Sequence, residues 1–358
     1  MKRTIVAVLA LVVVGAACGS SAKTSGPQST SANKPPSKTV TLLTHDAFAA
    51  SKSVLADFTK QTGFKIKLVQ SGDAGRVVNE AILRKDHPVA DAVYGIDNSF
   101  LSRALDGGIL DPYTPKGSDT IPTALWLDPQ HRVTPVDTGD VCINYDNTWF
   151  GHDGRPPAPT GFASLTDPRY KNLTVVESAA TSSPGLAFLI ATMSAQPGRS
   201  WQDYWRALKS NGVRVVNDWT EAYETDFTAG GGPGDRPIVV SYASSPPADV
   251  VYSEPHHDTP RVGVVDSTCI RQIEFAGVLH NASNPVGAQA LVDFLVSRRF
   301  QADMPLQMYV NPVQPGTPLP AVYKKWASQP AHPLTIDPAQ VAAHRDEWIK
   351  EWNDIAVR

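Results

Sequence analysis

The sequence contains many side chains that could act in catalysis, but it does not arrange them in a pattern that enzymes use. Nine His stand among many Ser and Asp residues, yet no Gly-x-Ser-x-Gly turn, His-Glu-x-x-His helix or paired-carboxylate signature frames them. The run His256-His257-Asp258 offers metal-ligand types, but adjacent side chains on a loop seldom point at one ion. We therefore expect no metal site, no cofactor and no enzyme, with a secreted hydrolase as the weaker hypothesis.

One carboxylate stands where α/β sheets commonly present ligands. Asp97 follows the apolar segment Ala92–Tyr94, within the turn Gly95–Asn98, and ligands often bind beyond the ends of such strands. The same residue could instead cap the first turn of a helix over Ser99–Ala104. Asp97 is thus a candidate either for a ligand contact or for a helix N-cap.

A polar turn precedes an apolar helix in the middle of the chain. The segment Thr181–Gly185 reads Thr-Ser-Ser-Pro-Gly and leads into Leu186–Met193. Hydroxyl groups and free backbone N–H groups at a helix N-terminus can bind an oxyanion or a phosphate. Ser182 or Ser183, followed by Pro in the first turn, is equally a good N-cap. Both roles are compatible, and Ser182, Ser183 and Gly185 are candidate ligand contacts.

Alternating strand and helix patterns must position these residues. Such alternation is typical of mainly parallel sheets with flanking helices, and two sheet-and-helix units follow each other along the chain. The predicted strands are Val40–Leu43, Ile66–Val69, Ala92–Tyr94, Val136–Asp146, Leu173–Val176, Val213–Val216, Ile238–Tyr242 and Ile273–Leu279. The predicted helices are Ala50–Thr59, Arg76–Leu83, Leu101–Ala104, Gly185–Ala195, Trp201–Ser210, Pro285–Arg299, Pro320–Ser328 and Pro338–Ile355.

The N-terminus predicts export. Lys2 and Arg3 precede the apolar run Ile5–Ala17, which is too short to span a bilayer. Small residues ending at Cys18 resemble a bacterial lipobox, so we expect a signal peptide over 1–17, a lipidated Cys18 and a flexible tether over 18–38. The alternative is an ordinary signal peptide that happens to contain a Cys. The expected location is the cell membrane, facing the periplasm or the cell exterior.

Composition limits what the remaining chain can do. The formal net charge of the whole sequence is −3, which provides no basic surface for nucleic acid. About 320 residues of ordinary apolar content can bury a large core and favour two lobes. An oxidising compartment would allow Cys142 and Cys269 to pair, although two buried free thiols are the alternative.

The segments, taken in order, resemble a bacterial periplasmic solute-binding protein that feeds an ABC importer, and within that family the thiamine-binding members. The resemblance covers nearly the whole mature length. It rests on Leu43–Phe48, Ala90–Asn98, Val136–Asp140 with Ile143–Asp146, Thr181–Leu186, Trp219–Tyr223, Val240–Pro246, Asn284–Phe300, Met304–Val313 and Pro338–Trp348.

The resemblance implies a monomeric, two-lobed α/β protein of the class II periplasmic-binding type, each lobe a central mixed sheet flanked by helices. Lobe 1 would comprise 39–136 with 268–306, and lobe 2 would comprise 137–267 with 307–358. Thiamine or a thiamine phosphate would lie in the cleft between them. Closure of the lobes around the ligand would be read by the membrane permease.

The resemblance also implies roles for individual residues. Asp97 would face the positive end of the ligand, and Trp219 and Tyr242 would line the ring site, where each face adds about 0.5–2 kcal/mol by cation–π attraction. Tyr223, four residues after Trp219, could share its helical face. At Tyr309 the thiamine binders commonly show Trp. The remaining candidates for the cleft are His45 and Asp46, together with Asp137 and Asp140, which lie where the chain would first pass from lobe 1 to lobe 2.

Related carriers of ferric ion, polyamines or phosphonates are the alternatives within the same fold. Ferric carriers typically use adjacent tyrosines, whereas Tyr242 is followed here by Ala243. A polyamine would require several acidic and aromatic walls, which the sequence leaves open.

Overall fold

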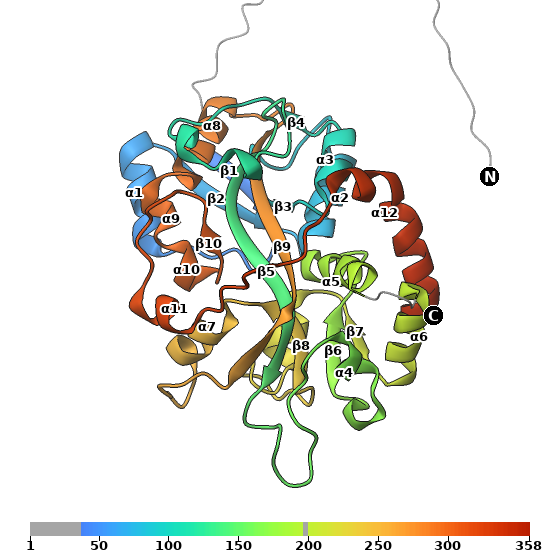
Figure 1. Cartoon of the computed structure of the whole chain (residues 1–358). Helices are drawn as coiled ribbons and strands as arrows, with labels where there is room; N and C mark the ends of the chain where they lie inside the picture. The colour runs from blue at the N-terminus through green and yellow to red at the C-terminus, as the bar shows by residue number, and fades with distance from the viewer. Residues whose placement is uncertain (1–36, 196–199) are drawn as a thin grey trace, which may run out of the picture. The chain divides into compact units, whose positions relative to one another are not determined.

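A mixed β-sheet runs through the folded part of the chain, as the computed structural model in Figure 1 shows. The structure describes residues 37–195 and 200–358. The predicted signal peptide and the predicted lipidation site at Cys18 lie outside the described residues. No described helix has both the length and the apolar character that crossing a membrane requires.

The first half of the sheet is built from parallel strands. β1 (Thr39–Thr44) pairs in parallel with β2 (Lys65–Gln70) and with β3 (Ala92–Asp97). The third of these strands is buried along its whole length. The elements packed around this half are α1 (Lys52–Thr62), α2 (Ala74–Leu83), α3 (Leu101–Asp106), the short strand β4 (Leu110–Asp111) and α8 (Pro285–Leu295).

The second half repeats this arrangement. β6 (Thr174–Glu177) lies parallel to both β7 (Arg214–Val216) and β8 (Ile238–Tyr242). The helices of this half are α4 (Phe162–Thr166), α5 (Ser183–Ser194), α6 (Trp201–Ser210) and α7 (Ser245–Tyr252). In Figure 1 β6, β7 and β8 lie in the lower part of the view, and β1, β2 and β3 lie in the upper part.

Two long antiparallel strands belong to both halves. β5 (Thr134–Asp146) pairs with β9 (Val262–Leu279), and the register shifts near Val136 and Cys142 bend the pair. The strand order is β2-β1-β3-β9-β5-β8-β6-β7. The predicted two-lobed α/β fold with mixed sheets is therefore confirmed. The predicted lobe boundaries at 136/137 and 267/268 fall inside these two strands and stay a prediction.

One predicted strand was too short. β9 begins at Val262 rather than at Ile273, because polar residues such as Asp266, Thr268 and Gln272 interrupt the apolar pattern that signals a strand. Gln272 has a backbone partner in the neighbouring strand β5, whereas Asp266 and Thr268 lie at the register shift between the two strands. There the Thr268 hydroxyl accepts from the backbone N–H of Ile143 over 3.0 Å, so the polar side chain helps to join the strands. The extension matters because β9 carries residues that the site uses.

The C-terminal part of the chain crosses the side of the molecule. Its elements are α9 (Arg298–Gln301), α10 (Met304–Gln307), β10 (Asn311–Pro312), α11 (Ala321–Trp326), α12 (Pro338–Trp352) and a π-helical turn at Asn353–Val357. α12 packs against α3 of the first half and α6 of the second. The remaining turns are Ser118–Thr120, Thr123–Leu125, Pro168–Tyr170 and the π-helical Thr220–Asp226.

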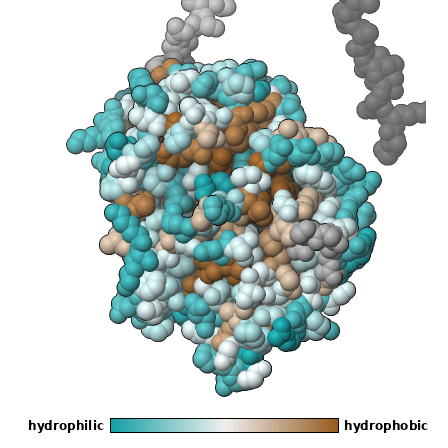
Figure 2. Space-filling model, in the orientation of Figure 1, coloured by the Kyte–Doolittle hydropathy of each residue, from teal (hydrophilic) through white to brown (hydrophobic). Residues whose placement is uncertain are grey.

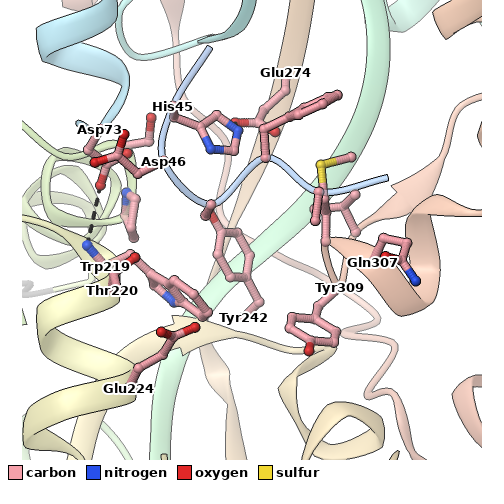
Figure 3. Close-up of a pocket in the computed structure, with 17 residues that line it drawn as sticks. His45, Asp46, Asp73, Trp219, Thr220, Glu224, Tyr242, Glu274, Gln307 and Tyr309 are labelled. Atoms are coloured by element: carbon pink, nitrogen blue, oxygen red, sulfur yellow. Dashed lines mark hydrogen bonds and ion pairs between the residues drawn. The ribbon is translucent and has the colours of Figure 1, made fainter. Parts of the chain in front are cut away.

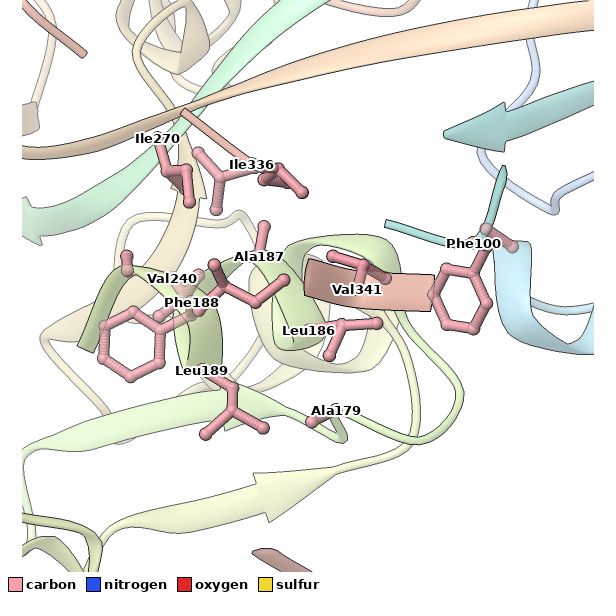
Figure 4. Packing of buried hydrophobic residues seen from close by; sticks show 14 of the residues in the cluster. Phe100, Ala179, Leu186, Ala187, Phe188, Leu189, Val240, Ile270, Ile336 and Val341 are labelled. Atoms are coloured by element: carbon pink, nitrogen blue, oxygen red, sulfur yellow. The ribbon is translucent and has the colours of Figure 1, made fainter. Parts of the chain in front are cut away.

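α5 is buried on every side, which explains its almost uniformly apolar sequence. Figure 4 shows its side chains between residues of the two halves. Phe188 lies beside Val240 of β8, while Leu186 points toward Val341 of α12 and Phe100. The N-terminus of α5 is consequently held by packing on all sides, so the side chains there have little freedom to move.

A disulfide joins the two shared strands. Cys142 in β5 and Cys269 in β9 are bonded, so the pairing that the sequence left open is present in the structure. The bond closes a loop of 127 residues, and restricting so long a loop in the unfolded chain stabilises the folded state.

We expect the double substitution Cys142→Ala/Cys269→Ala to lower the free energy of unfolding by about 2–3 kcal/mol. Urea denaturation followed by tryptophan fluorescence measures this change. Reduction of the unsubstituted protein should lower its urea midpoint in the same direction. Equal midpoints for the oxidised protein and the double variant would contradict the expectation.

Candidate functional site

A cavity of about 360 Å³ lies where several chain segments from both halves meet. The segments are the loop after β1, the turns that start α2 and α5, the π-helical turn at Thr220–Asp226, the end of β8, the middle of β9 and the loop after α10. Its lining includes His45, Asp46, Phe48, Asp73, Ser183, Pro184, Trp219, Thr220, Glu224, Tyr242, Glu274, Gln307, Met308 and Tyr309. Figure 3 shows these side chains around a common space.

The wall of this cavity is strongly acidic. Four carboxylates line it, and no Lys or Arg does so within the described part of the chain: the acids are Asp46, Asp73, Glu224 and Glu274. In Figure 3 Glu224 lies on the opposite side of the space from His45 and Glu274. A concave surface lined by one sign of charge concentrates ions of the opposite sign. The cavity is therefore suited to a cation.

Aromatic rings form much of the remaining wall. The indole of Trp219 donates from Nε1 to Ser241 Oγ over 3.0 Å. Its ring stacks on that of Tyr223, with centroids 4.9 Å apart and planes 11° apart. Tyr223 is therefore a second layer that supports Trp219, as their spacing of four residues predicts.

The ring of Tyr242 packs closely against the backbone of Gly139. A Cβ on Gly139 would come within 2.9 Å of the ring, so the glycine permits this close approach. The Tyr242 hydroxyl donates to Gln272 Oε1 over 3.2 Å. Tyr309 adopts a left-handed backbone conformation with φ 57°, and the Ser244 hydroxyl donates to its carbonyl oxygen. The Tyr242 ring and the Tyr309 backbone are thus positioned before a ligand arrives.

Glu274 belongs to a buried group of acids. Tyr94 places its hydroxyl 2.6 Å from Asp137 Oδ2 and 3.0 Å from Glu274 Oε2. Burial, followed by the nearby charge of Glu274, raises the pKa of Asp137 well above its usual range. Asp137 therefore holds a proton more tightly than an exposed Asp does, and Glu274 is the acid of this group that lines the cavity. His45 Nε2 lies 3.7 Å from Glu274 Oε1, too far for a hydrogen bond.

Asp97 lies behind the cavity wall rather than in it. Its Oδ1 accepts hydrogen bonds from the backbone N–H groups of Ser99 and Phe100 and from the Ser99 hydroxyl. Its Oδ2 accepts from the hydroxyl of Ser183, which does line the cavity. Asp97 thus caps the turn that precedes α3, whereas the predicted N-cap position of α3 itself is held by Phe100. A direct contact between Asp97 and a ligand is therefore not supported here, because the carboxylate is buried and occupied.

The burial of Asp97 predicts a pH dependence of stability. Desolvation raises its pKa to about 7, above the value of about 3.9 that an Asp has in an unfolded chain. The folded state then binds a proton more tightly than the unfolded state does. The stabilisation that Asp97 contributes is present below about pH 4 and is lost as the pH rises toward about 7.

We expect Asp97→Asn to flatten this part of the stability profile. Chemical denaturation at intervals between about pH 4 and pH 7 would measure it. Asp119→Asn, at an exposed position, is the matched control and should reproduce the unsubstituted profile. An unchanged slope in Asp97→Asn would show that this carboxyl does not titrate in the window.

The other predicted site residues divide into two groups. His45, Asp46, Ser183, Trp219, Tyr242 and Tyr309 line the cavity, whereas Ser182, Gly185, Asp137 and Asp140 do not. Arg271 lies 2.6 Å from Asp140 and forms an ion pair with it. A Cβ on Gly185 would come within 2.7 Å of the Glu177 and Ser178 carbonyl oxygens, so this glycine serves close packing.

Three of the four cavity carboxylates were missed by reasoning from sequence. Asp73 accepts from the backbone N–H of Ala74 at the start of α2, and its position after a strand is the signal that could have revealed it. Glu274 lies within the predicted strand Ile273–Leu279, where nothing marked it as facing a cavity. No local signal singles out Glu224.

The histidine pair does not form a metal site. His257 lies 2.9 Å from Asp249, whereas His256 lies 3.5 Å from the exposed Asp258. The two histidines therefore turn to different acids. Across residues 37–195 and 200–358, no three His, Cys, Asp or Glu side chains are grouped so that they could hold a metal ion.

Comparisons with known proteins identify the family and the fold of the chain. The family model described as bacterial extracellular solute-binding protein matches residues 87–328. The thiamine-binding periplasmic protein of Escherichia coli is 27% identical over 323 residues, which cover 89% of this chain and 94% of that protein. A solved periplasmic thiamin binding protein superposes with a TM-score of 0.76 at 26% identity, over 89% of this chain and 96% of that one. Iron-bound HitA from Pseudomonas aeruginosa, at 16% identity, TM-score 0.69 and coverage of 89% and 99%, shares the fold.

Proposed function

Because the chain belongs to the bacterial extracellular solute-binding proteins, a family of carriers rather than of enzymes, we propose that it captures thiamine in the cavity between its two halves and delivers it to an ABC importer. The observation that carries this proposal is the combination of four carboxylates, aromatic walls and no described Lys or Arg in one cavity. The cavity also lies within the size range of about 300–1,000 Å³ that is usual for small-molecule sites.

The chemistry of thiamine matches this wall. Its thiazolium ring carries a permanent positive charge, and its aminopyrimidine ring is flat and polar. We assign Glu274 and Asp73 to the cationic end, and Trp219 and Tyr242 to the ring faces, where cation–π attraction adds to burial. The Ser183 hydroxyl, positioned by Asp97, is a further contact at the cavity wall.

Free thiamine is favoured over its phosphates. A phosphate group would bring negative charge into a cavity that is lined by four carboxyl groups and by no described Lys or Arg. Like charges in a partly desolvated site repel each other. The N-terminus of α5 beside Ser183 is the part of the wall where a phosphate would meet backbone N–H groups. We expect weaker binding of thiamine monophosphate than of thiamine.

Calorimetric titration tests the proposal. Thiamine should bind with a single site per chain, and binding should quench or shift the fluorescence of Trp219. Spermidine, ferric citrate and thiamine monophosphate serve as parallel ligands. No detectable binding of thiamine at high micromolar concentration would overturn the proposal, and tighter binding of spermidine would reassign the cavity to a polyamine.

A polyamine is the second candidate because the four carboxylates are spread around the space instead of gathered at one end (Figure 3). An extended polycation could contact several of them at once. The aromatic faces favour a flat ring more strongly, and this preference places thiamine first. Ferric ion is the weaker candidate, since Tyr242 uses its hydroxyl to bond Gln272.

We propose in addition that Cys18 carries a lipid that holds the exported protein at the membrane. This proposal rests on the basic residues, the apolar run and the small residues that precede Cys18. Expression of the full chain in a bacterium, followed by fractionation, tests it. The unsubstituted protein should sediment with membranes, and Cys18→Ser should not. Equal distribution of the two proteins would overturn the anchor.

A further inference from the structure

A second hollow lies on the side of the molecule where α12 packs against the first half. It measures about 370 Å³ and shares no lining residue with the acidic cavity. Its walls come from α2, α3, the turn before α5, α12 and the C-terminal turn. The edge formed by α12 is predominantly hydrophilic in Figure 2. We call this hollow the α12 groove.

The charge of the α12 groove is opposite to that of the acidic cavity. Four basic residues line it, and within the described residues a single carboxylate, that of Asp346, does so; the basic residues are Arg103, Arg345, Lys350 and Arg358. The Asp346 side chain is 84% exposed, so water screens its charge. The convergence of several cations without an equal number of acids is unfavourable unless an anion joins them.

Arg345 is the central residue of the groove. Its side chain is only 9% exposed, and its guanidinium lies over the ring of Phe100, 4.5 Å from the centroid. One terminal nitrogen bonds Asp346 over 3.0 Å, whereas the buried Nε has no hydrogen-bond partner. Buried donors are nearly always satisfied. The unpaired Nε therefore indicates a missing acceptor.

The neighbouring basic residues also keep donors available. Arg103 uses Nε to donate to Asn79 Oδ1 over 2.9 Å, which orients its guanidinium and leaves its terminal nitrogens for another acceptor. The Lys350 side chain makes no hydrogen bond or ion pair with the described residues, and Arg358 pairs with Asp354 on the same turn. Guanidinium groups have a planar donor geometry that matches carboxylate and phosphate oxygens.

We propose that the α12 groove binds a small polyvalent oxyanion, of the size of pyrophosphate or citrate, that clamps α12 onto α2 and α3. The anion would draw the Arg345 guanidinium toward the groove, so that its buried Nε gains an acceptor. It would also bridge residues that are far apart in the chain, Arg103 on α3 and Lys350 on α12. Because such an anion binds only the folded arrangement, it would raise the apparent stability of the protein. This site is independent of the ligand assigned to the acidic cavity.

Calorimetry with inorganic pyrophosphate in metal-free buffer tests the proposal on the full chain. We expect saturable binding that weakens as the salt concentration rises. Lys350→Gln should weaken binding by about five-fold, and Arg345→Gln by more, because charge-assisted bonds are lost. Lys324→Gln, an exposed position on α11, is the matched control and should bind as the unsubstituted protein does.

Thermal denaturation provides a second measurement. It is needed because Arg345→Gln could lose binding by misfolding rather than by loss of a contact. Pyrophosphate should raise the melting temperature of the unsubstituted protein and of Lys324→Gln, and it should raise that of Lys350→Gln less. Lys350 is exposed, so this variant is expected to fold. Absence of pyrophosphate binding at millimolar concentration, or equal affinity in Lys350→Gln and Lys324→Gln, would overturn the site.

Discussion

Glu274→Gln is expected to weaken thiamine binding by about 100- to 1,000-fold, because truncating or neutralising one partner of a buried charge pair costs about 3–4 kcal/mol. Glutamine keeps the shape of the side chain and can still accept from the Tyr94 hydroxyl, which lies 3.0 Å from the carboxylate. The substitution therefore removes charge with little change in packing. Isothermal titration calorimetry with thiamine measures the loss.

Two controls distinguish a lost ion pair from a distorted cavity. Glu80→Gln alters a carboxylate that pairs with Arg84 on α2, away from the cavity, and should leave the affinity unchanged. The aminopyrimidine fragment of thiamine lacks the thiazolium charge, so its affinity should be nearly the same in Glu274→Gln and in the unsubstituted protein. Equal losses for thiamine and for the fragment would show that Glu274 does not face the cation.

Trp219→Ala is expected to weaken thiamine binding by about 100-fold, since a buried aromatic anchor contributes about 2–4 kcal/mol in a binding site. The substitution removes the ring face that lines the cavity and the Nε1 bond to Ser241. It also leaves Tyr223 without its stacking partner. The measurement is again calorimetric, since this variant loses the fluorescence signal that reports binding.

Trp219→Phe separates the aromatic face from the hydrogen bond. It keeps a smaller ring over the ligand and should recover most of the affinity that Trp219→Ala loses. Trp149→Phe is the matched control, because Trp149 follows the far end of β5 and does not line the cavity. If Trp219→Phe bound no better than Trp219→Ala, the hydrogen bond to Ser241 rather than the ring face would be the important feature.

The position of Asp97 changes how the cavity is expected to work. The Asp97 carboxylate bonds Ser183 and the turn before α3, so it connects the N-terminus of α5 to the end of β3. Asp97 is therefore a positioning residue, and its substitution should alter thiamine affinity less than Glu274→Gln does. Carriers of this two-lobed type close by hinge motion around the ligand, and this bond lies where the two halves meet.

Much of the fold could be predicted from the sequence, because the periodicity of apolar residues and the local composition can be read from neighbouring residues alone. β8 and α6 begin and end where their apolar patterns do, and the Thr-Ser-Ser-Pro-Gly turn does start α5. α7 was not predicted, since Pro246 and Pro247 look like helix breakers although both fit the first turn of a helix. The long start of β9 was missed for a similar reason, because its polar residues conceal the strand.

The sequence by itself determined the fold class, the order of the elements and most of the aromatic wall, because these follow from local pattern and from family resemblance. Only the tertiary structure decided which acids face the cavity. Asp73 and Glu274 are 201 positions apart in the chain, and nothing local shows that they meet, whereas Asp97 carries a strong local signal and lies buried behind Ser183. Whether a carboxylate is exposed to a ligand depends on what packs against it, and chain-distant segments supply that packing.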